Sequence, residues 1–331
     1  GTIYKGMLGS TPVAIKEIIA NMMNPADVRE FENEGRMIAI FRHPNILTGF
    51  GWCIKQNGTM GEQRRYLVTE LAKHGSLRDA IQSALKAEQA ITQGDKFAKM
   101  PFDGVQAVRW ALQIATGLRF VHGRGYMHRD VKPGNVLVVD GLFAKVADLG
   151  TARKDLSADA SPERERQLRE DRARVEELER EQQQSGEKDA DPEVGIVAAP
   201  IHRFGKYDPS TAMTNAVGTP LYIAPELMGG HNYSKQVDVW SYGVMLVEMF
   251  SLACPYPDTY QGWQIMKQVA MKRLRPNKLR REDLPHPGLL DVIEGCIMFR
   301  PDTRLTIAQV ESKLGIILEE MVAAAAGEPS P

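Results

Sequence analysis

The stretch His128-Arg129-Asp130-Val131-Lys132-Pro133-Gly134-Asn135, followed by the apolar run Val136–Val139, decides the fold of this chain. Before it, apolar residues recur at helical spacing from Asp103 to His122, and glycines then end the helix. The run after it predicts a strand. A carboxylate, an ammonium group and a carboxamide therefore lie in one turn between a helix and a strand. An ordinary charged turn would not need all of them, so the stretch indicates a site where polar groups converge.

Three more charged positions fall on or near predicted secondary structure. Lys16 ends the apolar strand pattern Val13-Ala14-Ile15, so its ammonium group projects from apolar surroundings and needs an anionic partner. Glu34 can supply one, because it lies on the amphipathic helix predicted from Asp27 to Phe41. Taken alone, this pair is a weak signal, since most strand lysines lie at an edge or on the surface. Asp148-Leu149-Gly150 follows a second short strand, 13 residues after Asn135.

Composition narrows the possible classes of protein. The 331 residues are 43% hydrophobic, enough for one large domain or for two lobes with separate cores. Lys plus Arg (41) nearly balances Asp plus Glu (42), so no charge excess indicates nucleic acid or an anionic membrane as a partner. The cysteines Cys53, Cys254 and Cys296 form no CxxC pair, which favours a reducing, cytoplasmic compartment. No apolar stretch reaches the roughly 20 residues of a membrane span.

From Gly1 to about Met321 the sequence resembles the eukaryotic protein kinase superfamily, and its motifs occur in family order. The resemblance implies an α+β, bilobal fold, with a small β-rich N-lobe carrying one main helix over residues 1–72. A larger, mostly helical C-lobe is expected over residues 73–322, with a disordered tail over residues 323–331.

The resemblance also implies a role for each polar residue. Family members transfer the γ-phosphoryl group of ATP, with Mg²⁺, to hydroxyl groups of protein substrates. Asp130 would accept the hydroxyl proton, and Lys132 would steady the transferring phosphate. Asn135 and Asp148 would bind magnesium, while Lys16, paired with Glu34, would contact the ATP phosphates. Further nucleotide contacts in the phosphate loop, around the adenine ring and along the hinge are assigned by the resemblance to Gly1, Ile3, Ala14, Thr69, Glu70, Ala72 and Leu137.

Other motifs fit the same family. Ala224-Pro225-Glu226 resembles the motif that closes the activation segment, and Arg304 stands where members carry the arginine that pairs with its glutamate. Asp238 resembles the aspartate that holds the catalytic loop by hydrogen bonds. Lys132 and Gly218-Thr219-Pro220 resemble the serine/threonine pattern, in which Thr219 bonds the catalytic aspartate and lysine. We therefore expect a serine/threonine kinase.

Several stretches, among them His43-Pro44-Asn45-Ile46, are similar to the tyrosine-kinase-like group. The sequence also departs from the family pattern. Only the end of the glycine-rich loop is present, so an N-terminally truncated kinase without its first strand is expected, and Leu149 replaces the usual phenylalanine. Two alternatives stay open, a pseudokinase acting as a binding scaffold and a dual-specificity kinase. The retained lysine, acidic and asparagine groups favour catalysis.

Residues 155–215 form a charged insertion within the activation segment. A helix is predicted from Ser161 to about Gln184, either solvated or binding a partner. Arg129, beside the catalytic aspartate, is typical of kinases whose activation loop is ordered by a phosphate. The nearest acceptors are Thr211, Thr214 and Ser210, which an upstream kinase or regulatory partner would target, and an unregulated loop is the alternative. The basic run over residues 272–281 predicts either a docking site for acidic partners or a solvated face.

Overall fold

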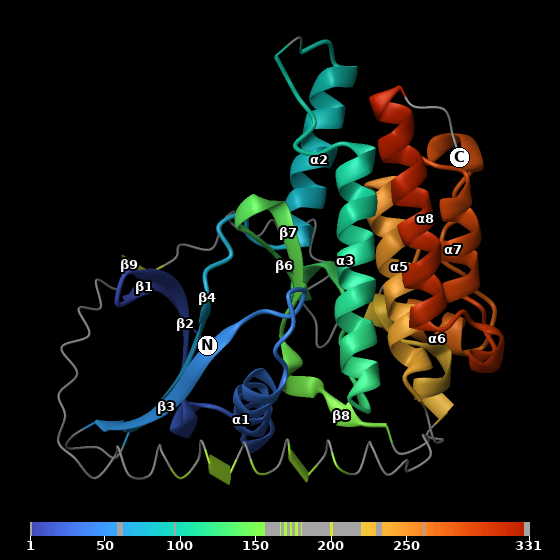
Figure 1. Ribbon diagram of the computed structural model, residues 1–331. Helices are drawn as coiled ribbons and strands as arrows, with labels where there is room; N and C mark the ends of the chain where they lie inside the picture. The colour runs from blue at the N-terminus through green and yellow to red at the C-terminus, as the bar shows by residue number, and fades with distance from the viewer. Residues whose placement is uncertain are drawn as a thin grey trace.

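The computed structural model describes residues 2–57, 62–95, 97–155, 199–200, 220–229, 234–260 and 262–327, with seven further residues between Arg166 and Arg180. Figure 1 shows an antiparallel sheet with helix α1 beside it, and a set of longer helices beyond the short strands β6 and β7. The expected α+β fold, with a sheet-rich N-terminal part followed by a mostly helical part, is confirmed.

The N-terminal sheet has the strand order β3-β4-β2-β1-β9. β1 (Thr2–Leu8) and β2 (Thr11–Ile19) form an antiparallel hairpin, which is joined by the turn Gly9-Ser10. On its other side β2 pairs with β4 (Glu62–Glu70), which pairs with β3 (Gly49–Asn57). Since β2 lies between two strands, the backbone of its Lys16 is fixed from both sides.

Helix α1 (Pro25–Ile40) packs on this sheet and agrees with the predicted amphipathic helix. Asn24 caps its first turn, because the Asn24 side chain accepts a hydrogen bond from the Asp27 amide at 2.9 Å. The buried face of the helix carries Phe31 and Ile38 together with one acidic residue, Glu34. An unpaired carboxylate there would be costly, so α1 must bring Glu34 to a cation.

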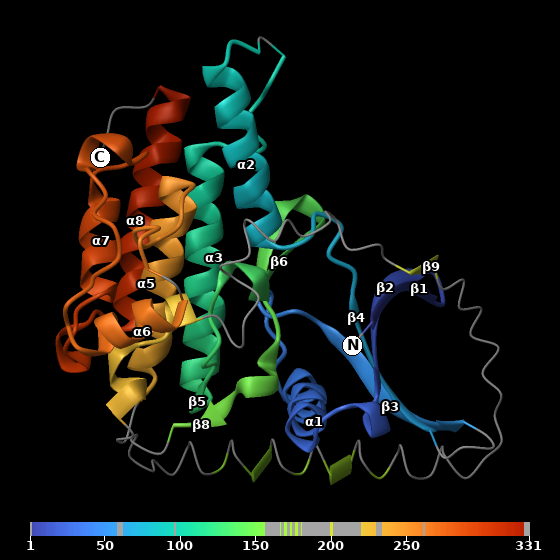
Figure 2. The same ribbon diagram turned by 180° about the vertical axis from the view of Figure 1, so that it is seen from behind.

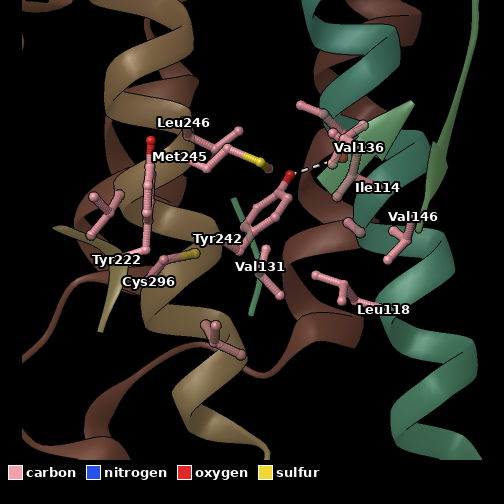
Figure 3. Packing of buried hydrophobic residues seen from close by; sticks show 14 of the residues in the cluster. Ile114, Leu118, Val131, Val136, Val146, Tyr222, Tyr242, Met245, Leu246 and Cys296 are labelled. Carbon is pink, nitrogen blue, oxygen red and sulfur yellow. Dashed lines mark hydrogen bonds between the residues drawn. The ribbon is translucent and has the colours of Figure 1, made fainter. Parts of the chain in front are cut away.

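The C-terminal part consists mainly of helices α2 (Leu77–Thr92), α3 (Gly104–Gly123), α5 (Gln236–Ser251), α6 (Gly262–Ala270), α7 (Gly288–Cys296) and α8 (Ile307–Ala326). Ser76 and Asp79 form a reciprocal capping box at the start of α2. Helix α5 is buried on most sides, and α3 packs against α8. Figure 3 shows Tyr242 of α5 pointing toward α3, where its hydroxyl donates to the Ala111 carbonyl at 2.8 Å.

Two small antiparallel pairs of strands flank the polar stretch from His128 to Asn135. β5 (Tyr126–Met127) pairs with β8 (Arg153–Lys154), and β6 (Val136–Val139) pairs with β7 (Phe143–Val146). The loop between β5 and β6 therefore starts and ends at fixed positions. A last short strand, β9 (Ala199–Pro200), lies beside β1.

The C-terminal end differs from the expectation of a disordered tail starting at residue 323. Helix α8 continues through Ala326, because four successive alanines favour a helix. Gly327 then ends it in the left-handed conformation, with φ of 75°. Residues 328–331 lie outside the described part of the chain.

The described residues of the charged insertion agree with a helix, since all seven between Arg166 and Arg180 are helical and exposed. Arg166 pairs with Glu170, and Arg180 with Glu176, each one turn apart along the helix. Within the part of the chain that the structure describes, no helix combines the length and apolar character that a membrane crossing requires.

Candidate active site

The Lys16 ammonium group lies 2.5 Å from a carboxylate oxygen of Glu34, so the predicted pair between β2 and α1 forms. Burial would lower the pKa of Lys16, but the carboxylates of Glu34 and Asp148 outweigh burial and raise this pKa above its ordinary value. Burial, together with the charge of Asp148, also raises the pKa of Glu34 against the effect of Lys16. One ammonium group thus faces two carboxylates, which leaves surplus negative charge at this point.

Asp148 is held in a specific backbone conformation at the end of β7. It adopts the left-handed region with φ of 58° and ψ of 65°, which is uncommon for a residue with a side chain. The next residue, Leu149, is buried in the core, as expected for the apolar residue that replaces phenylalanine. Asn33 of α1 donates its amide to the carbonyl oxygen of Gly150 at 2.8 Å and to that of Ala152 at 3.2 Å. Helix α1 therefore binds both β2 and the segment after Asp148.

The loop from His128 to Asn135 brings its three polar groups together. The Asp130 carboxylate accepts hydrogen bonds from the Lys132 ammonium group at 2.5 Å and from the Asn135 amide at 2.8 Å. The same Asn135 amide also donates to the Asp130 backbone carbonyl at 2.9 Å. Because the side-chain nitrogen of Asn135 is used in this way, its side-chain oxygen is the group left to meet a cation.

Backbone hydrogen bonds join this loop to Asp148. The Ala147 amide donates to the Asn135 backbone carbonyl at 2.8 Å, and the Ala147 carbonyl is 2.9 Å from the buried His128 ring. Asp148 directly follows Ala147 and acts electrostatically on Lys16. Hydrogen bonds thus connect Asp130, Asn135 and the residue before Asp148, and the Asp148 carboxylate acts on Lys16.

Asp238 of α5 binds the start of the loop that runs from His128 to Asn135. Its fully buried carboxylate accepts hydrogen bonds from the backbone amides of His128 at 2.8 Å and Arg129 at 2.7 Å, and contacts the His122 ring at 2.7 Å. Burial would raise the pKa of Asp238, but the bonds from His122 and the Arg129 amide, with the charge of the histidines, lower it overall. These bonds fix Arg129 in its left-handed conformation, with φ of 71°.

The side-chain oxygens of Asn135 and Asp148 form a donor set that fits a magnesium ion. The carboxylates of Glu34, Asp130 and Asp148 face the two ammonium groups of Lys16 and Lys132, so a further cation would balance the charge. Among the described residues no three His, Cys, Asp or Glu side chains cluster as a metal cage. Magnesium commonly binds through one or two protein oxygens and completes its shell with phosphates and water. An Asn and an Asp oxygen, beside a lysine able to meet phosphates, match that pattern.

The residues expected around the adenine ring lie near this region. Ile3 pairs across the hairpin with Lys16 and is 48% exposed, while Ala14 pairs with the buried Thr69 on β4. Leu137, half buried, forms a bridge with Ser76.

Glu70 has a role that the sequence analysis missed. Its amide donates to the Thr48 carbonyl at 2.9 Å, and its carboxylate binds the Lys145 ammonium group and the Thr48 amide, each at 2.6 Å. The Glu70 carbonyl accepts a hydrogen bond from the Thr69 hydroxyl at 3.3 Å. Through Lys145, the hinge is joined to β7. Only the fold, which places Lys145 beside the end of β4, could have shown this contact.

Several expected site groups lie outside the described residues. They are Gly1, Thr219, and the phosphate acceptors Thr211 and Thr214 with Ser210. The predicted structural pair is present: Arg304, whose side chain is fully buried, binds Glu226 at 2.6 and 2.8 Å. In the basic run over residues 272–281, Arg280 pairs with Asp283 and Arg281 with Asp291. These internal pairs favour a solvated face over a docking site.

Gly150 should be intolerant of a side chain. A Cβ atom there would lie 2.8 Å from the Glu30 carbonyl of α1, and backbone on both sides leaves no flexible group to yield. Gly150→Ala is expected to push α1 outward, to cost about 1–3 kcal/mol in unfolding free energy, and to lower activity about tenfold or more. Denaturant unfolding measures the loss of stability, and phosphoryl-transfer assays measure the loss of activity. Gly123→Ala is the control, because nothing lies within 4 Å of that Cβ position, and an equal loss in both variants would refute the argument.

Comparisons with known proteins agree with this geometry. Residues 1–186 match the family described as protein tyrosine and serine/threonine kinase, and residues 203–314 match the protein kinase domain. Serine/threonine-protein kinase STY17 of Arabidopsis thaliana is 25% identical over 321 residues, covering 97% of this chain and 43% of the relative. Dual specificity protein kinase shkB of Dictyostelium discoideum is 24% identical over 314 residues, covering 95% of this chain and 37% of the relative.

A human relative, serine/threonine-protein kinase WNK4, is 25% identical over 312 residues, covering 92% of this chain and 19% of the relative. The chain spans less than half the length of these three curated relatives. The first family match alone covers 186 of the 331 residues. With its motifs joined into one region between a sheet and a helical part, the chain belongs to the protein kinase family.

Proposed function

We propose that this chain catalyses transfer of the γ-phosphoryl group of ATP to serine or threonine hydroxyl groups of protein substrates. The observation that carries the proposal is the set of contacts around Asp130. Its carboxylate is held by Lys132 and Asn135, and backbone bonds connect Asn135 to the residue before Asp148. A binding scaffold has no need to keep an acceptor carboxylate, a phosphate-binding lysine and two magnesium oxygens in contact.

In the proposed reaction the chain's own residues bind, orient and accept a proton. Lys16, kept charged by Glu34, would bind the nucleotide phosphates. Asn135 and Asp148 would hold Mg²⁺, which when bound neutralises charge on the phosphates. Asp130 would orient the substrate hydroxyl and accept its proton, and Lys132 would balance the negative charge that spreads over the transferring group.

We also propose a boundary between two lobes, with residues 1–72 forming one lobe and residues 73–322 the other.

Serine/threonine specificity rests on Lys132 in the catalytic loop and on the resemblance at Thr219. Two relatives named as serine/threonine-protein kinases, STY17 and WNK4, favour the same specificity. The similarity to STY17 also favours membership of the tyrosine-kinase-like group. Dual specificity is the second candidate, because two similar Dictyostelium proteins, shkA and shkB, are named as dual specificity kinases.

The test is transfer of radiolabelled phosphate from ATP to a generic basic protein, followed by phosphoamino acid analysis. Label on serine and threonine alone supports the proposal, and label on tyrosine as well supports dual specificity. Absence of transfer by the chain would favour the pseudokinase scaffold.

Lys16→Met is expected to lower transfer about 10²- to 10³-fold, because it removes one preorganised charge beside the phosphates. Its control is Lys55→Met, an exposed lysine on strand β3, which β4 separates from the strand of Lys16. Equal activity of the two variants would contradict the assigned role of Lys16. Circular dichroism checks that both variants keep the fold.

We also propose that phosphorylation around Thr211–Thr214 raises activity, with Arg129 as the partner of the phosphate. Alanine substitution of Thr211, Thr214 and Ser210 is expected to prevent activation by an upstream kinase. If that kinase activates all three variants as strongly as it activates the parent, the idea is wrong and an unregulated loop is favoured.

A further inference from the structure

Arg78 lies at the start of α2, beside the loop from His128 to Asn135. Its neighbour Leu77 is fully buried, and α2 contacts both β6 and the turn Pro133–Asn135. Figures 1 and 2, which view the molecule from opposite sides, both place one end of α2 next to β6. The guanidinium carbon and one terminal nitrogen of Arg78 lie 3.5 Å from the position that a Cβ atom on Gly134 would occupy. The charge of Arg78 therefore lies against the loop that carries the proposed catalytic residues.

The guanidinium group of Arg78 has no partner among the described residues. No hydrogen bond or ion pair of Arg78 is present within that part of the chain, and its buried Nε–H lacks an acceptor. The side chain as a whole is half buried. A buried donor without an acceptor costs free energy, and a cation in the first turn of a helix is opposed by the helix dipole. Helix stability does not account for an arginine here, and its position favours an anionic ligand.

A candidate partner within the chain is Glu248 of α5, but this carboxyl group is already used. It accepts a hydrogen bond from the Tyr222 hydroxyl. Burial raises the pKa of Glu248 and that of Tyr222 above their ordinary values, and the charge of Arg78 acts on both groups against this effect. Arg78 therefore lies close enough to act on Glu248 and Tyr222 without pairing with either, and its hydrogen-bond donors stay available.

A protein substrate would lie near the same loop. In the proposed reaction the acceptor hydroxyl lies at Asp130, four residues before Gly134 in the sequence. Four residues of chain span at most about 14 Å. An extended peptide advances about 3.3 Å per residue. A substrate with its hydroxyl at Asp130 can thus bring residues within about four positions of that hydroxyl to Arg78.

We propose that Arg78 is a specificity-determining residue, whose guanidinium group binds an anionic side chain of the protein substrate within about four positions of the acceptor hydroxyl. A guanidinium group donates two parallel hydrogen bonds to a carboxylate or to a phosphate, so both groups fit this site. A basic side chain at the same position meets a like charge and is disfavoured. The inference rests on the proposed function, because it needs a protein substrate bound at Asp130.

Steady-state kinetics with a set of serine peptides tests the proposal. Each position within about four residues of the serine carries Glu, phosphothreonine, Gln or Lys in turn. At the positions that face Arg78, the anionic peptides are expected to have a kcat/KM about tenfold above that of the Gln peptide, as one charge-assisted hydrogen bond supplies. The gain is expected mainly in KM, and the Lys peptide should be the poorest. A larger gain with Glu identifies an acidic residue as the ligand, and a larger gain with phosphothreonine identifies a phosphorylated one.

Variants of Arg78 assign the preference to this residue. Arg78→Gln is expected to remove the difference between anionic and neutral peptides, Arg78→Lys to keep part of it, and Arg78→Glu to reverse it in favour of the Lys peptide. Lys86→Gln is the matched control, because Lys86 is an exposed cation on the same helix, about 12 Å further along its axis. This control should keep the preference of the parent. Circular dichroism checks that each variant is folded.

The outcomes separate this proposal from the proposed function. Phosphorylation without a preference for an anion, a preference that survives Arg78→Gln, or an equal loss on every peptide in Arg78→Gln would overturn the role of Arg78 and leave the proposed function standing. If no peptide is phosphorylated, the proposed function fails, and fluorescence anisotropy of a labelled Glu peptide decides the remaining question. Binding about tenfold weaker in Arg78→Gln than in Lys86→Gln would support the anion site, and equal binding would refute it.

Discussion

Replacing Asp130 with asparagine is expected to lower the rate of phosphoryl transfer about 10²- to 10⁴-fold, the range that a positioned general base contributes. An asparagine has nearly the same size, and its oxygen can still accept from Lys132 or Asn135, so the loop should keep its shape. What the variant loses is the group that accepts the hydroxyl proton. Steady-state kinetics with radiolabelled ATP should therefore show a reduced kcat with little change in KM for ATP.

The control for this prediction is Asp140→Asn, which makes the same chemical change on an exposed residue outside the loop. Asp140 pairs with Lys73 on the surface, where such pairs contribute little. Activity of the Asp140→Asn protein should match the parent. An Asp130→Asn protein that is equally active and equally stable would show that this carboxylate takes no part in proton transfer.

Replacing Asp238 with alanine is expected to give the largest loss of stability, about 3–5 kcal/mol in unfolding free energy. The variant leaves the buried amides of His128 and Arg129 without their acceptor and the His122 ring without its partner. Urea denaturation followed by circular dichroism measures the loss. Asp302→Ala is the matched control, because Asp302 forms an exposed pair with Arg300 and its loss should change stability little.

The same carboxylate makes stability depend on pH with a definite sign. The pKa of Asp238 is lower in the folded protein than its ordinary value, so its contribution is complete above pH of about 4 and is lost as pH falls through the folded pKa. The gap in unfolding free energy between the parent and Asp238→Asn should therefore be widest at neutral pH and should narrow below a pH of about 4. A gap that stays constant from neutral pH down to about pH 3 would contradict the lowered pKa.

Local spacing explains why much of the site could be predicted from the sequence. Asp130, Lys132 and Asn135 lie within one turn, so their order along the chain nearly determines their contacts. The helix of Glu34 was predictable from its apolar spacing, and the strand of Lys16 from its β-branched neighbours. Their pairing needed the family resemblance, because no local pattern relates a strand lysine to a carboxylate 18 residues later.

The remaining contacts depend on packing between distant segments. The Lys145–Glu70 pair joins residues 75 positions apart, and Asn33 bonds carbonyl groups more than 100 positions away. Strand β9 gave no sequence signal beyond an apolar run in a charged region. Helix α8 continues beyond residue 323, where a disordered tail was expected, because the four alanines are strong helix formers.

Adjacent residues on α1 hold two different partners, Asn33 the carbonyl groups after Leu149 and Glu34 the ammonium group of Lys16. Consecutive positions on a helix point about 100° apart, so turning the helix about its axis cannot keep one set of bonds while releasing the other. Movement of α1 should then break the two attachments in a single cooperative step, with no stable intermediate in which only one of them survives.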